Sequence, residues 1–281
     1  MKNDSQNRIF PLVWDVVAMI VLFFVAQLIG GVVLALCGAK APVVSPDESI
    51  TAEQYMCEQV AFANYNAVVF PLLMGFALLL VWLYVRLRGG RRAVTIRHAV
   101  GGLNPSVIFV GVMWLLSSQI VLEPLLAWLP SSNGGDVGRG VCAWITVMIS
   151  APILEELLCR GLLYETLRKR WSIAISIAIS ALFFGVLHAD WNTSIVAMVA
   201  GAIFSVLYER TSSIFVTIIV HSINNALAYA LMCFGLGDAT FGSIFGGGVT
   251  YYVVYAVAVV IFVAASVEAY FKLSKQCKTV E

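Results

Sequence analysis

The sequence predicts an all-α, polytopic membrane protein with about eight transmembrane helices and both termini in the cytoplasm. Hydrophobic residues make up 60% of the 281 residues and charged residues 12%, whereas an ordinary soluble domain is roughly 25% charged. The mean hydropathy is +0.91. Apolar runs of the length needed to cross a bilayer core of about 30 Å recur along the chain. Short connections leave no room for a sizeable water-soluble domain, so we expect one compact helical domain in the lipid bilayer.

Each helix is predicted from an apolar run, and the sixth run is the shortest of them. The runs lie at 12–36, 62–85, 106–129, 141–166, 171–190, 193–208, 212–233 and 249–271.

The orientation follows from the positive-inside rule, by which cytoplasmic loops carry the Lys and Arg residues. Five arginines follow the second run, whereas Lys40 stands among four acidic residues in the connection before it. Both termini are therefore expected in the cytoplasm, and the short loops favour a bacterial plasma membrane. The net charge of +1 is spread over loops, which argues against nucleic-acid binding.

Ionisable residues inside the apolar runs are few, and they gather in three runs. A charge at the bilayer centre costs roughly 2.5–3.5 kcal/mol on insertion scales, so such residues are the first candidates for function. The fourth run contains Glu155, Glu156 and Arg160, the fifth ends in Phe184 and His188, and the seventh contains His221 and Asn225.

Helical geometry indicates which of these side chains act together, because residues four apart share a face. Glu156 can pair with Arg160, and Glu155 then faces elsewhere. His221 and Asn225 share one face, and the Phe184 ring lies a turn before His188. We expect Glu155 as a general base in a polar cavity, with His221 and Asn225 as oxyanion donors.

Three motifs resemble those of the CAAX prenyl protease and bacteriocin-processing family, also called Abi-type intramembrane proteases. The family's E-E-x-x-x-R is similar to Glu155, Glu156 and Arg160, its F-x-x-x-H to Phe184 and His188, and its H-x-x-x-N/D to His221 and Asn225. The resemblance covers roughly residues 140–232. It implies an eight-helix intramembrane endopeptidase in which Glu155 and His188 activate water, His221 and Asn225 hold the oxyanion, and Glu156 with Arg160 supports the site.

The resemblance also allows a zinc ion, with His188, His221 and Glu155 or Glu156 as ligands, although a glutamate mechanism needs no metal. The implied substrate is a membrane-embedded or lipidated protein or peptide. By function we divide the chain into helices 1–3 (1–139), the catalytic core (140–232), and the eighth helix with its cytoplasmic tail (233–281). The sequence makes no prediction about oligomeric state.

Two other functions stay open at this point. The same fold accommodates a non-proteolytic scaffold or an immunity protein against a secreted peptide, and buried acids also occur in proton-coupled transporters. Glu123 lies outside the three motifs, near the outer end of its run, and is predicted to be structural or interfacial.

One count fits the site poorly. His188 lies seventeen residues past Trp171, whereas His221 lies nine past Ser212, so two straight helices would hold the imidazoles at different depths. We therefore expect the fifth helix to be tilted, partly re-entrant or to begin later than drawn.

Overall fold

A computed structural model describes residues 10–44, 51–90, 94–100, 103–129, 137–188, 190–237 and 239–278. Of the described residues, 81% are helical, and they form no strand, only an isolated bridge between His98 and Ser213. Among the described residues, seven helices are long and apolar enough to cross a membrane, and an eighth apolar helix, Ile173–Val186, is shorter. The predicted all-α, polytopic fold class is confirmed.

The elements follow the predicted runs with three main differences. They are α1 (Val13–Leu36), α2 (Ala52–Gly89), α3 (Pro105–Leu126), α4 (Val141–Ile145), η2 (Thr146–Ser150), α5 (Ala151–Glu156), η3 (Leu157–Tyr164), α6 (Glu165–Leu167), α7 (Ile173–Val186), α8 (Trp191–Thr211), α9 (Ile214–Cys233), α10 (Phe241–Ile244) and α11 (Gly248–Lys278).

The first difference is that α2 begins ten residues before its apolar run, at Ala52. Thr51 and Gln54 form a capping box there, which satisfies the free N–H groups of the first turn. The second is that the short helix is the fifth, α7, and not the sixth, because α8 extends over 21 residues. The third is that the fourth run contains two π-helical stretches, η2 and η3.

Contacts divide the chain into two compact units, and not into the single domain expected. Unit 1 comprises residues 1–96 and 136–176, and unit 2 comprises residues 97–135 and 177–281. Helix α7 begins in unit 1 and continues into unit 2. The functional division at 1–139, 140–232 and 233–281 stays a prediction.

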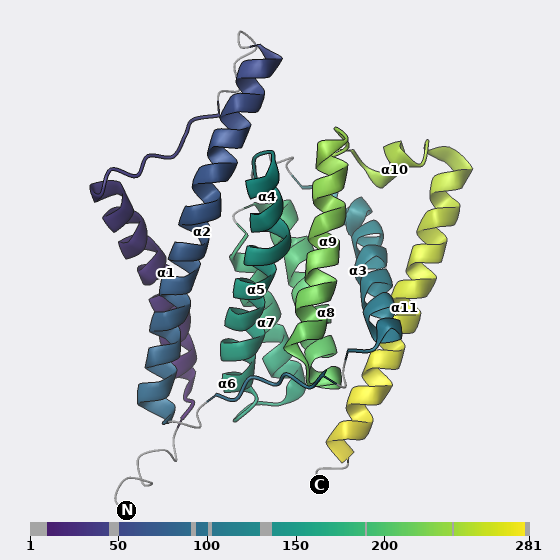
Figure 1. Cartoon of the computed structure of the whole chain (residues 1–281). Helices are drawn as coiled ribbons and strands as arrows, with labels where there is room; N and C mark the ends of the chain where they lie inside the picture. Colours follow the sequence, from purple (N-terminus) through teal and green to yellow (C-terminus); the bar gives the residue numbers. More distant parts are fainter. Residues whose placement is uncertain are drawn as a thin grey trace, which may run out of the picture. The chain divides into compact units, whose positions relative to one another are not determined.

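Unit 1 is built on α2, against which α1 and the α4–α6 helix pack (Figure 1). Buried Asp15 in α1 accepts hydrogen bonds from the Tyr84 hydroxyl at 2.7 Å and from Arg88 Nε at 2.9 Å, which joins the first two helices. Gly138 precedes α4 with a φ of +76°, and a Cβ there would lie 2.7 Å from the Gln59 carbonyl oxygen. Only glycine therefore allows the chain to approach α2 so closely.

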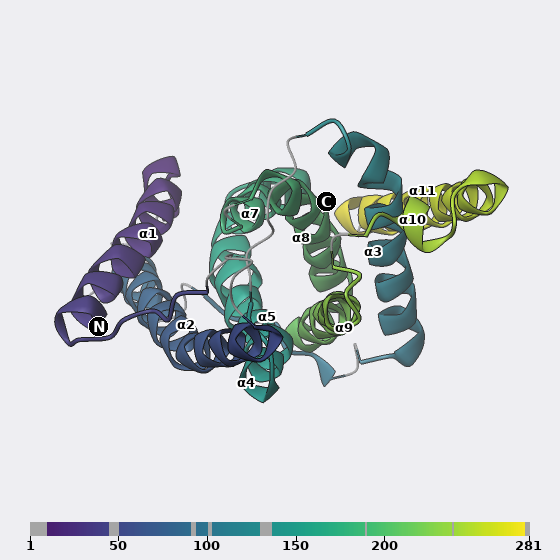
Figure 2. The same ribbon diagram turned by 90° about the horizontal axis from the view of Figure 1, so that it is seen from above.

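Unit 2 is built on α3, α8 and α9, with α11 packed along α3 (Figure 2). Trp114 of α3 donates a hydrogen bond to Ser266 of α11 at 3.1 Å. Helices α8 and α9 are joined by Ser212, whose φ of 51° ends α8 in the left-handed region. Arg97 holds this turn through Glu209 at 2.7 Å and through the Tyr208 ring.

Candidate active site

Four aromatic side chains of unit 2 form one contact group, called here the imidazole cluster: Phe184, His188, Phe204 and His221. The Phe184 ring centroid lies 5.2 Å from that of His188 and 5.6 Å from that of His221. The Phe204 ring stacks on His221 at 5.0 Å. Phe184 and Phe204 are buried. The structure therefore brings both predicted histidines against the predicted phenylalanine.

His188 lies just beyond the end of α7, in the connection to α8. Its Nδ1 lies 2.9 Å from the Phe184 carbonyl oxygen, and because a carbonyl only accepts hydrogen bonds, Nδ1 carries the proton in the neutral ring. Nε2 then keeps its lone pair, which suits it to bind the hydrogen of a water molecule. The Ser194 hydroxyl donates to the His188 carbonyl oxygen, so the backbone of this connection is also fixed.

The depth discrepancy of the sequence count persists in the helix bounds, because His188 lies fifteen residues past Ile173, where α7 begins, and His221 seven past Ile214, where α9 begins. Helix α7 begins at Ile173 and ends at Val186, so His188 belongs to the turn between two helices and not to a long straight helix. The contacts of both imidazoles with Phe184 place them at one level in unit 2.

Close packing of α7 on α8 holds this turn in place. A Cβ on Gly185 would lie 2.2 Å from Met198 Cγ and 2.8 Å from the Ser194 carbonyl oxygen. A Cβ on Gly201 would lie 3.1 Å from Ala181 Cα and from Phe184 Cβ. Small residues at both positions let the two backbones approach closely.

His221 and Asn225 lie one turn apart on α9, as predicted. His221 is buried and Asn225 is half-buried. Asn224 donates to Asn225 Oδ1 at 3.4 Å, and Gln119 of α3 donates to Asn224 Oδ1 at 2.6 Å. A chain of three amides therefore connects α3 with the residue predicted to hold the oxyanion.

The predicted acids lie in unit 1. Glu156 and Arg160 are fully buried and form an ion pair of 2.8 Å, as the spacing predicts. Glu155 is half-buried. The π-helical stretches η2 and η3 precede and follow α5, and such widened turns occur frequently at functional sites.

Zinc is the one metal ion that the resemblance allows, and the fold does not test it. No group of three or more His, Cys, Asp or Glu side chains within the described ranges could hold a metal. The zinc ligands that the resemblance implies are divided between unit 1 (Glu155, Glu156) and unit 2 (His188, His221). Zinc stays a prediction, and no step below depends on it.

The three motifs lie in one segment of the chain, and a family model matches that segment. Residues 138–227 match the family model described as Rce1-like, type II CAAX prenyl endopeptidase. The predicted resemblance is confirmed for this Rce1-like segment, which contains every candidate residue named above. The match supports an intramembrane protease of the CAAX type in general. Neither the curated proteins nor the solved structures contain a significant match to the chain.

The motifs of the Rce1-like segment did not indicate every residue around the candidate site. Phe204, Ser194 and Asn224 contact motif residues but carry no motif of their own. Gln119 in turn contacts Asn224. Gln119 could have been found from the sequence, because it is a polar residue inside an apolar run. Phe204 is one apolar residue among many, and the sequence does not distinguish it.

Proposed function

We propose that this protein is an intramembrane endopeptidase that hydrolyses a peptide bond of a membrane-associated or lipidated protein, and that it acts in a bacterial plasma membrane. The observation that carries the proposal is the imidazole cluster. It places the two histidines of separate motifs against one phenylalanine, inside the segment that matches the CAAX-type family model.

Hydrolysis begins when Glu155 takes a proton from water and the water oxygen attacks the peptide carbonyl carbon. A carboxylate within hydrogen-bond reach of a water molecule is suited to this role as a general base. His188 orients the same water through Nε2. Its Nδ1 is already committed to the Phe184 carbonyl oxygen.

The attack places negative charge on the carbonyl oxygen. The His221 ring and the Asn225 amide stabilise this oxyanion with their N–H groups, and a donor of this kind contributes about 2.7–4 kcal/mol to lowering the barrier in a known hydrolase. Glu155 then gives its proton to the leaving amine, and the C–N bond breaks. The Glu156–Arg160 pair takes no part in the chemical step. It fixes the orientation of the helix that carries Glu155.

Glu155→Gln should abolish cleavage, because an amide cannot take the proton, while the fold stays intact. We would compare the N- and C-termini of membrane proteins by mass spectrometry in cells carrying wild type or the variant at matched expression. New termini that depend on Glu155 would establish proteolysis and identify the substrate.

Glu165→Gln is the matched control, because it removes a carboxylate ten residues further along the same segment, outside the proposed site. It should leave every cleaved terminus in place. Identical termini in wild type and Glu155→Gln, together with a preserved phenotype, would contradict proteolysis and favour the scaffold or immunity function.

A further inference from the structure

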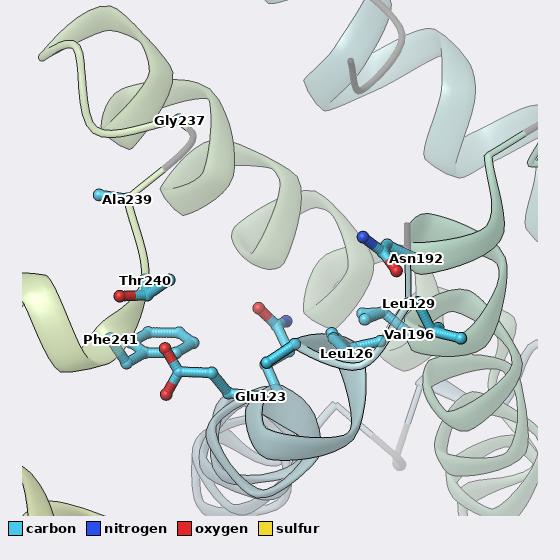
Figure 3. Close-up of a pocket in the computed structure, with 11 residues that line it drawn as sticks. Glu123, Leu126, Leu129, Asn192, Val196, Gly237, Ala239, Thr240 and Phe241 are labelled. Atoms are coloured by element: carbon cyan, nitrogen blue, oxygen red, sulfur yellow. The ribbon is translucent and has the colours of Figure 1, made fainter. Parts of the chain in front are cut away.

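Unit 2 contains a cavity of about 460 Å³ that none of the three motifs reaches. It lies between the end of α3, the start of α8 and the segment before α10 (Figure 3). Leu126, Val196 and Phe241 form apolar walls, and Gln119, Glu123 and Asn192 are the larger polar side chains that line it.

The polar side chains present oxygen atoms that need a donor. Glu123 Oε1 accepts a hydrogen bond from the Gly242 backbone N–H at 3.2 Å, and its Oε2 is buried. Asn192 Oδ1 is also buried and accepts no hydrogen bond from the described residues. Gln119 donates through its nitrogen to Asn224, so its amide oxygen remains an acceptor.

The charge of Glu123 has no partner of opposite sign. Besides Gly242, the polar neighbour of Glu123 is the neutral Tyr251 phenol. No basic side chain in the described part of the chain forms an ion pair with Glu123. Carboxylates in membrane helices are normally paired or belong to a ligand pathway. The contact with Gly242 accounts for one oxygen of Glu123 and leaves the charge unbalanced.

We propose that this cavity binds a primary ammonium group carried on an apolar chain. An ammonium offers three N–H donors and no acceptor, which suits the Glu123 carboxylate. Asn192 lies across the cavity from Glu123 (Figure 3), and its amide oxygen is an acceptor for a further donor group of the ligand. The aliphatic walls would contact the methylene groups of the ligand. The chemistry fits a lysine side chain of a membrane peptide and an ethanolamine lipid headgroup equally.

Hydrogen bonds connect this cavity to the candidate site of hydrolysis. Gln119 lines the cavity and also begins the amide chain through Asn224 to Asn225. A bound ammonium therefore lies within two further hydrogen bonds of the candidate oxyanion residue. Binding itself does not depend on proteolysis and can be measured without it.

The test is a calorimetric titration of the full-length protein in dodecyl maltoside with N-acetyl-Leu-Lys-Leu-amide. The same peptide with norleucine in place of lysine is the uncharged comparison. We expect saturable binding of the lysine peptide to wild type, at least tenfold weaker binding to Glu123→Gln, and no difference between these proteins with the norleucine peptide.

Two further variants keep the result interpretable. Asn192→Leu removes one acceptor but leaves the Glu123–Gly242 contact, so it should also weaken lysine binding at least tenfold even if Glu123→Gln does not fold. Glu268→Gln removes a carboxylate of the same unit that already pairs with Lys272, and it should bind as wild type does.

Competition distinguishes the sources of the ammonium. Displacement of the lysine peptide by dihexanoyl phosphatidylethanolamine, and not by the phosphatidylcholine equivalent, would assign the cavity to a lipid headgroup; no displacement by either would assign it to a peptide. Equal affinity of wild type, Glu123→Gln and Asn192→Leu for the lysine peptide would overturn the proposal, as would the absence of saturable binding by both ammonium probes.

Discussion

Arg160 and Glu156 are the only ion pair in the described residues in which both side chains are fully buried. Removing one partner of such a pair leaves an uncompensated charge in an apolar surrounding, whereas replacing both with apolar residues is frequently tolerated. The pair therefore fixes the direction of Glu156 away from Glu155 at an energetic cost that apolar residues would not carry. We interpret it as a device for positioning.

Arg160→Leu should lower the free energy of unfolding by about 3–5 kcal/mol, because Glu156 is left buried and unpaired. The double variant Glu156→Leu, Arg160→Leu should recover part of that loss. Detergent-induced unfolding followed by circular dichroism measures both. Arg210→Leu is the control, since its pair with exposed Glu268 should contribute less than about 1 kcal/mol. A single variant as stable as wild type would refute this account.

At the scale of elements, the crossing of α7 and α8 determines where His188 lies. Gly185 occupies a point where the opposite helix leaves no space for a Cβ, and at Gly201 a Cβ would make a tight contact with α7. Ser194 then reaches the His188 carbonyl oxygen from the first turn of α8. The position of a candidate catalytic side chain thus depends on two residues that have no side chain.

Gly185→Ala should displace α7 from α8 and lower both stability, by about 1–3 kcal/mol, and any cleavage activity. Gly75→Ala, at a helical glycine whose Cβ would meet nothing within 4 Å, should be neutral or slightly stabilising. Adding Met198→Ala to Gly185→Ala should restore part of the stability, because it removes the nearer contact. The melting temperatures of wild type, the two glycine variants and the double variant measure these effects. Equal melting temperatures of Gly185→Ala and Gly75→Ala would count against the packing argument.

At the scale of the molecule, the orientation predicted from loop charges can be tested on one helix. Cys57 and Leu87 are exposed near opposite ends of α2, about 45 Å apart at 1.5 Å per residue. With all other cysteines replaced by alanine, Cys57 should react with a membrane-impermeant maleimide added to intact cells. A protein whose single cysteine is Leu87→Cys should react only after the membrane is permeabilised. The opposite pattern would invert the topology.

The apolar helices and the motif residues could be predicted because both follow from local sequence. Apolar runs mark the part of a helix that lies in lipid, and four-residue spacing marks a helix face. The first turns of α2 could not be predicted this way, since a helix that extends past the apolar run has no hydrophobic signal there. The end of α7 was also missed, because Leu187 continues the run beyond the last helical residue.

The candidate site was predictable to the level of its motifs and no further. The four-residue spacing predicted that Arg160 pairs with Glu156 and that Asn225 lies one turn from His221, because both relations lie within one helix. Contacts between helices, such as those of Phe204 with His221 or of Gln119 with Asn224, depend on how the helices pack. The periodicity of apolar residues in the sequence does not predict how the helices pack.

The shortness of α7 has a consequence for how water reaches the imidazoles. Fourteen residues rise about 21 Å, so a helix of this length falls short of an average hydrocarbon core by about 9 Å. The turn that carries His188 then lies within the hydrocarbon core of the bilayer. Irregular backbone occurs at that depth only where it faces protein or enclosed water. Hydrophobic mismatch of this kind thins the adjacent bilayer, which shortens the path by which a water molecule reaches the imidazoles.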